Sequence, residues 1–146
     1  MILGFDPGRD KCGVAVMGVD RRIHWHQVIR ATEVINSVNV LCETYAISLL
    51  VIGNQTTSEE WVQRLLSAIP PNLRIIKIDE RYSTLEARSR YWQIFPPQGL
   101  ARFIPQELRS IRRPIDDIVA IVLIERYLDL PGVAVGSDER THRINP

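Results

Sequence analysis

The sequence lacks the features that would mark a secreted or membrane protein. Its two cysteines, Cys12 and Cys42, lie in apolar segments without a C-x-x-C spacing. We interpret both as buried thiols in a reducing compartment, not as part of a disulfide or zinc framework. The first apolar run is too short to span a membrane, and no basic stretch precedes it. These absences predict a cytoplasmic protein without a membrane partner.

A strong net charge is also missing. The chain has 18 Lys and Arg residues against 17 Asp and Glu residues, a formal charge of +1, so any surface for nucleic acid must be local. Hydrophobic residues make up 45% of the 146 residues, which suffices for one domain with its own core. No linker or internal repeat is evident. We therefore expect one domain over residues 1–130 and a disordered tail over 131–146.

Apolar runs and helical spacing alternate in an order that predicts an α/β fold. The expected strands cover 2–6, 12–19, 23–29, 47–53 and 73–78. The expected helices cover 31–45 and 57–69, a region that starts near Leu85, and 115–128, with Thr32 and Ser83 as N-caps. Short connections join the first three strands, and helices separate the later ones. This predicts a mixed five-stranded sheet, three antiparallel strands followed by two parallel ones, with helices on both faces.

Two stretches do not follow this alternation. Prolines interrupt the chain from Ile94 to Pro114, which predicts a long ordered excursion with about one short helical turn. His24 and His26 stand two residues apart on a predicted strand, so their side chains should point the same way. With no third ligand in view, surface histidines are favoured over a zinc pair.

Three acidic sites fall where this sheet would bring them together. Asp6 ends the first strand, Glu80 follows the last strand, and Asp116 starts the last helix; in such sheets, ligands collect at the carboxyl ends of the strands. Simpler roles exist, because Asp-Pro-Gly is good turn chemistry and an acid at a helix start favours that end. Converging carboxylates would repel each other, and a divalent cation relieves this. Hard oxygen ligands favour Mg²⁺ or Mn²⁺ over zinc, and a two-metal carboxylate site can hydrolyse phosphodiesters.

A basic segment accompanies the acidic sites. Between Arg88 and Arg113 there are six arginines and one acidic residue, Glu107, a local balance of +5. Arginine binds phosphate in a bidentate manner. Aromatic residues lie among the arginines and could stack on unpaired bases, although packing against the core is the favoured role for them. Phosphate contact by the arginines is at least as plausible as a solvated loop.

These residues resemble one family. Residues 2–8 (ILGFDPG) with Gly13-Val14-Ala15-Val16 are similar to its opening motif, residues 79–88 (DERYSTLEAR) to its central motif, and residues 116–120 (DDIVA) with 125–128 to its last helix. The family is the YqgF/RuvX group of Holliday junction resolvase-like or pre-16S rRNA-processing nucleases. The resemblance covers residues 2–129. It implies an RNase H-like fold and a metal-dependent nuclease acting on structured nucleic acid. The main role that it implies is 5′-end processing of the 16S rRNA precursor in ribosome biogenesis, and cleavage of branched DNA is the alternative.

Carried over position by position, the resemblance implies that Asp6, Glu80 and Asp116 are catalytic and bind Mg²⁺ or Mn²⁺. Asp117 falls on a variable position and is a neighbour or an alternate metal ligand. Arg81 would contact phosphate or hold Glu80 in place. The residues expected to bind nucleic acid are Arg9, Lys11, Arg81, Arg88, Arg109, Arg112 and Arg113. The chain departs from the family at Arg9-Asp10-Lys11, at residues 53–57 (GNQTT) in place of Gly-Leu-Pro, and in the length of its 89–115 segment.

Alternatives to a nuclease are weaker but open. A non-catalytic RNA- or ribosome-binding module would keep the arginines, but binding phosphate does not require a cluster of three carboxylates. An actin-like ATPase also carries Asp-x-Gly near its first strand, but it needs two such lobes. The choice between rRNA and branched DNA stays open, as does the choice between monomer and homodimer, although branched DNA would favour a symmetric dimer.

Overall fold

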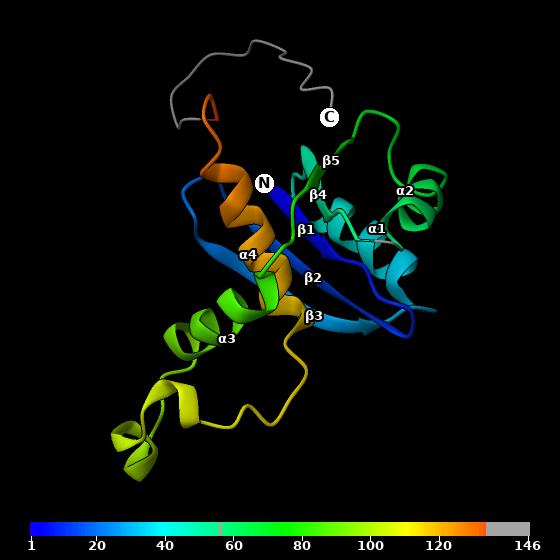
Figure 1. Cartoon of the computed structure of the whole chain (residues 1–146). Helices are drawn as coiled ribbons and strands as arrows, with labels where there is room; N and C mark the ends of the chain where they lie inside the picture. Colours follow the sequence, from blue (N-terminus) through cyan, green and yellow to red (C-terminus); the bar gives the residue numbers. More distant parts are fainter. Residues whose placement is uncertain (56, 134–146) are drawn as a thin grey trace.

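A computed structural model describes residues 1–55 and 57–133 and shows a mixed sheet covered on both faces (Figure 1). The expected tail over 131–146 falls mostly outside the described residues. The strands are β1 (Ile2–Asp6), β2 (Lys11–Met17), β3 (Ile23–Arg30), β4 (Leu49–Gly53) and β5 (Arg74–Ile78). The helices are α1 (Val34–Thr44), α2 (Ser58–Leu66), α3 (Ser83–Ile94) and α4 (Asp116–Leu128), with short 3₁₀ helices at Gly99–Phe103 and Gln106–Leu108.

The sheet has the order β3-β2-β1-β4-β5. β1 pairs antiparallel with β2, and β2 pairs antiparallel with β3. β4 and β5 run parallel to β1. Three antiparallel strands followed by two parallel ones were predicted, and the fold class is confirmed.

Each face of the sheet has its own hydrophobic core. Alternate residues of the strands, such as Phe5 and Ile52, pack with residues of α1 and α2. The other residues, such as Ala15 and Val51, pack against α4, which crosses that face (orange in Figure 1). α4 is buried on nearly all sides, since residues 118–124 are all buried and α3 packs against it as well. The apolar sequence of this helix predicted such a central position.

Some local predictions were wrong. α3 begins at Ser83 itself, after Tyr82 in a left-handed conformation with φ of 61°, so Ser83 is not its cap. α1 begins at Val34 after Glu33, without a side-chain cap, so Thr32 does not cap it. None of the helices in the described ranges is long and apolar enough to cross a membrane.

The pairing of β2 with β3 shifts register between Val16 and Met17. Because of this irregularity, the side chains of His24 and His26 point to different faces of the sheet. The ring of His24 lies 6.2 Å from that of Tyr45, which follows α1, whereas His26 reaches α4 on the other face. The expectation that the two histidines point the same way was wrong, because the extra residue breaks the strict alternation of a regular strand.

Candidate active site

Asp6 stands at the centre of the candidate site because of its place in the sheet. It is the last residue of β1, and its partner on β2 is Gly13. On the other side, Phe5 pairs with Ile52 of β4, so the next residue of β4, Gly53, lies beside Asp6. The carboxylate thus projects between two positions that carry no side chain.

These two glycines let the other acidic residues approach. A Cβ on Gly13 would lie 1.8 Å from the carbonyl oxygen of Asp116. A Cβ on Gly53 would lie 2.6 Å from the carboxyl carbon of Glu80. Real side chains do not tolerate such distances, so any larger residue would push the start of α4 or the Glu80 side chain away from Asp6. Glycine is required here for close approach, not for a special backbone angle.

Glu80 follows β5 and is held by the loop after β4. Only 4% of its surface is exposed. The backbone N–H of Gln55 donates a hydrogen bond to Glu80 Oε1 at 2.5 Å, and the backbone N–H of Glu80 donates to Asn54 Oδ1 at 3.3 Å. Burial raises the pKa of the Glu80 carboxyl, and the hydrogen bond from Gln55 partly opposes this. The loop that departs from the family motif is therefore the one that orients Glu80.

The three carboxylates affect one another electrostatically. Burial, followed by the charges of Glu80 and Asp116, raises the pKa of Asp6 to about 8 from its ordinary value of 3.8. Asp116 is more open, with 29% of its side chain exposed, and Lys11 Nζ lies 3.9 Å from its carboxylate. Without a further cation, the site disfavours full ionisation.

The loop after Asp6 is anchored from the opposite face. Trp61 of α2 is buried, and its Nε1–H donates a hydrogen bond to the carbonyl oxygen of Gly8 at 3.0 Å. Its ring also packs against Phe5, with centroids 5.4 Å apart. The contacts of Trp61 thus fix the chain on both sides of Asp6.

The donor set suits a hard divalent cation, because it consists of carboxylate oxygens and carries a surplus of negative charge. Within residues 1–55 and 57–133, however, no three His, Cys, Asp or Glu side chains are arranged as a ready coordination sphere. The carboxylates lie close enough to raise the pKa of Asp6, but they are not drawn together around one point. The oxygen atoms and negative charge of these side chains therefore fit a divalent metal ion, although the three carboxylates do not surround a single point.

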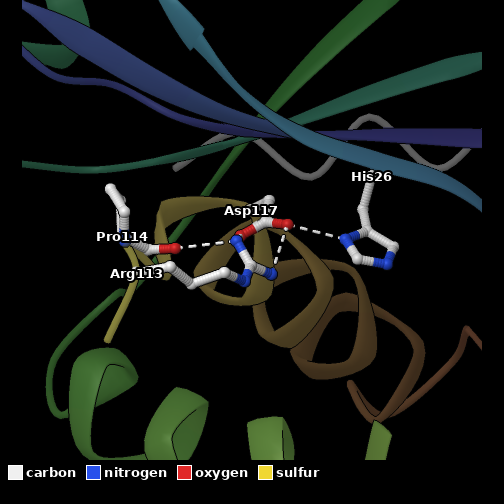
Figure 2. Close-up of polar contacts among 4 residues, drawn as sticks. All are labelled: His26, Arg113, Pro114 and Asp117. Atoms are coloured by element: carbon white, nitrogen blue, oxygen red, sulfur yellow. Dashed lines mark hydrogen bonds and ion pairs between the residues drawn. The ribbon is translucent and has the colours of Figure 1, made fainter. Parts of the chain in front are cut away.

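Asp117 differs from its neighbour Asp116. It is buried, and both of its carboxylate oxygens are engaged by protein groups. Arg113 donates to Oδ1 and Oδ2 at 3.1 and 3.0 Å, and His26 Nδ1 lies 2.6 Å from Oδ2 (Figure 2). Hydrogen bonds from these two partners and the charge of Arg113 outweigh burial and lower the pKa of Asp117. Protein groups already engage both oxygens of Asp117, and its role as an alternate metal ligand stays a prediction.

The residues expected to bind nucleic acid fall into two groups. Arg109 and Arg113 bind other groups of the same chain. Arg109 Nε donates to the carbonyl oxygen of Ile104 at 2.9 Å, and its guanidinium lies 5.4 Å from the Trp92 ring centroid. Arg113 pairs with Asp117. The other side chains are exposed to solvent, namely Arg9, Lys11, Arg81, Arg88 and Arg112.

Four residues near the site were missed by the sequence analysis. Arg126 of α4 donates to the carbonyl oxygen of Asp79 at 2.7 Å and also pairs with Glu86, so it ties α4 to the turn that carries Glu80. The others are His26, Asn54 and Gln55. Of these four residues, Asn54 and Gln55 alone had a signal in the sequence, because residues 53–57 depart from the family motif. The partners of Arg126 and His26 are too distant in sequence to leave a local pattern.

Comparisons with known proteins agree with this architecture. The family described as "RuvX: Holliday junction resolvase" matches residues 1–130. The chain is also 28% identical over 142 residues to a protein of a Sulfurihydrogenibium species named "Putative pre-16S rRNA nuclease". That alignment covers 88% of this chain and 89% of the relative, so the likeness extends over nearly the whole length of both.

Proposed function

Because the chain belongs to the RuvX family, whose match covers residues 1–130, we propose that it is a divalent-metal-dependent nuclease that hydrolyses phosphodiester bonds in structured nucleic acid. The observation that carries this proposal is the position of Asp6 between Gly13 and Gly53, with Asp116 and Glu80 closing over these glycines. Three carboxylates concentrated at one edge of a sheet are costly for a protein that only binds phosphate. They are useful to a protein that binds cations.

In the proposed mechanism Asp6, Glu80 and Asp116 would hold Mg²⁺ or Mn²⁺ as the ligands of a two-metal carboxylate site. The bound ions would supply a lowered pKa for the attacking water and charge stabilisation for the leaving oxygen. Gln55 keeps Glu80 oriented through its backbone N–H. Asp6 keeps a fixed position because its strand is hydrogen-bonded on both sides. The protein thus contributes a rigid set of oxygen ligands.

The exposed basic residues would hold the substrate through its phosphates. Arg9 and Lys11 flank the turn after Asp6, and Arg81 follows Glu80 directly. Arg88 and Arg112 are exposed on α3 and on the segment that leads into α4. Arginine and lysine at these positions would place a phosphodiester backbone next to the carboxylates.

We propose a 16S rRNA precursor as the preferred substrate, which the name of the Sulfurihydrogenibium relative supports. A four-way DNA junction is the second candidate, which the family description supports. A binding module without catalysis is the third; it would leave the cluster of three acidic residues without a role.

The test compares cleavage of three labelled substrates: a pre-16S rRNA 5′ leader, an unstructured single-stranded RNA and a four-way DNA junction. Each is incubated with Mn²⁺, with Mg²⁺ or with EDTA. Asp6→Asn and Asp116→Asn should abolish cleavage. Asp129→Asn is the matched control, because it makes the same change at the other end of α4, where the carboxylate pairs with exposed Arg21.

Metal-dependent cleavage that both site variants lose would support the nuclease, and the fastest substrate would identify the preferred class. Cleavage that survives in EDTA or in both variants would overturn the carboxylate mechanism. Tight binding of a substrate by the wild type without cleavage in any metal would establish the binding module instead.

A further inference from the structure

A polar cluster outside the three carboxylates joins β3, α4 and the end of the excursion. Its centre is the buried carboxylate of Asp117, which accepts two hydrogen bonds from Arg113 and contacts His26 Nδ1 at 2.6 Å (Figure 2). Arg113 Nη1 also donates to the carbonyl oxygen of Pro114 at 2.8 Å. A buried carboxylate paired in this way is costly to disturb, since removing one partner leaves an uncompensated charge.

Aromatic rings from the end of α3 complete the cluster. The Arg113 guanidinium lies 5.6 Å from the ring centroid of Tyr91 and 5.5 Å from that of Phe95. The His26 ring meets Phe95 edge to face at 6.0 Å. These contacts fix the plane of the guanidinium, so that both of its Nη atoms face Asp117. The cluster therefore connects three segments that are far apart in the sequence: β3, the end of α3, and residues 113–117.

The position of this cluster matters because of what it adjoins. Asp117 is the next residue after Asp116, and Arg113 belongs to the segment that enters α4. The start of α4 has no side-chain cap. Its first turn is held instead by the contact of the Asp116 backbone with Gly13 and by the bonds to Asp117. The cluster thus holds the residue next to Asp116 through side chains of β3 and of the segment before α4.

We infer that His26 and Arg113 are positioning residues, which act through Asp117 to hold the first turn of α4 so that Asp116 faces Asp6 and Glu80. This inference rests on the proposed function, because it assigns the metal ligation to those three carboxylates. The inference also explains why Asp116 and Asp117, which are adjacent in the sequence, have different surroundings. Asp117 is bound by Arg113 and His26, whereas the Asp116 carboxylate is partly exposed and lies 3.9 Å from Lys11 Nζ.

The test uses Arg113→Ala, His26→Ala and His26→Asn, with His24→Ala as the matched control. The amide nitrogen of asparagine stands close to the place of a histidine Nδ1, so His26→Asn can restore the bond to Asp117. His24 lies on the same strand but contacts the opposite face. Four quantities are measured for each protein: Mn²⁺ affinity by calorimetry, kcat and KM for the substrate that the wild type cleaves, and Tm.

We expect Arg113→Ala and His26→Ala to lower Mn²⁺ affinity and kcat by about 10- to 100-fold, as is usual when a group that orients a metal ligand is removed. KM should change little, because both side chains are engaged with Asp117. His26→Asn should recover most of both losses, and His24→Ala should match the wild type. All assays are run well below the lowest Tm, so that unfolding does not contribute.

The outcomes separate this inference from the proposed function. If Tm falls while Mn²⁺ affinity and kcat stay at the wild-type level, the cluster only stabilises the fold and the inference is wrong. If the wild type binds Mn²⁺ but cleaves nothing, the nuclease proposal fails, and the inference stands only if the variants lose Mn²⁺ affinity. If the wild type binds no Mn²⁺, both proposals are overturned.

Discussion

The carboxyl carbon of Glu80 lies 2.6 Å from the position that a Cβ on Gly53 would occupy. Glu80 comes from the turn after β5, and Gly53 ends the neighbouring strand β4. The carboxylate therefore lies directly over the sheet, next to Asp6, because Gly53 has no side chain. The position of the Glu80 carboxylate beside Asp6 therefore depends on Gly53, which has no functional group of its own.

Gly53→Ala should consequently impair the site more than the fold. The added methyl group must displace Glu80, and overpacking of this kind costs about 1–3 kcal/mol of stability. We expect kcat to fall by about tenfold or more, as for loss of a group that orients a metal ligand, while the protein remains folded by circular dichroism. Gly18→Ala is the control, since a Cβ there meets the movable side chain of Asp20. Equal activities of the two variants would contradict the role of Gly53.

Asp6→Asn should stabilise the protein in the absence of metal. The pKa of Asp6 is raised to about 8 in the folded protein. Its stabilising contribution is therefore fully present below the ordinary pKa near 3.8 and is lost as the pH rises through about 8. In EDTA, urea unfolding at about pH 8 should show Asp6→Asn to be more stable than the wild type by about 1 kcal/mol or more.

The same comparison at about pH 5 should show a smaller difference, because Asp6 is then mostly protonated in the folded wild type. Asp129→Asn should show no such pH-dependent gain. If Asp6→Asn is less stable than the wild type at both pH values, the carboxylate is held by favourable contacts and the repulsion inferred among the three acidic residues is wrong.

The sheet, and the position of Asp6 and Glu80 at one edge of it, could be predicted from the sequence for physical reasons. Continuous apolar runs such as Leu49–Gly53 are typical of strands covered on both faces, and β1, β4 and β5 run parallel, so Asp6 and Glu80 emerge at the same edge. The glycines at 13 and 53 were visible in the sequence. Their contact with Asp116 and Glu80 was not, since it depends on the packing of α4 and of the turn after β5.

The supporting contacts could not be predicted, because they depend on where side chains end up after folding. The register shift in β2 and β3 sends His24 and His26 to different faces, and a simple alternation rule misses it. Arg109 and Arg113 have the same local pattern as Arg112. The tertiary structure reveals that Arg109 and Arg113 form hydrogen bonds within the protein.

The hydrogen bond from Gln55 to Glu80 can be tested through the backbone. Gln55→Pro removes the N–H that donates to Glu80 Oε1 and leaves a buried carboxylate without its donor, which costs about 1–3 kcal/mol. The expected result is a clear loss of Mn²⁺ affinity and of kcat. Gln55→Ala keeps the N–H and should retain much more of both. If the two variants lose the same activity, the side chain of Gln55 matters and the backbone bond does not.

Arg112 and Arg109 provide the last test, because they are three residues apart and have different surroundings. Arg112 is exposed, so Arg112→Ala should weaken nucleic-acid binding and reduce the slope of log K against log salt by about 1, the loss of one phosphate contact. Arg109 bonds the carbonyl oxygen of Ile104 and covers Trp92, so Arg109→Ala should leave that slope unchanged and speed proteolysis between residues 95 and 112. The measurements are fluorescence titrations at several salt concentrations and limited chymotrypsin digestion. An unchanged salt slope for Arg112→Ala would remove Arg112 from the nucleic-acid surface, whereas a reduced slope for Arg109→Ala would mean that its internal contacts open when substrate binds.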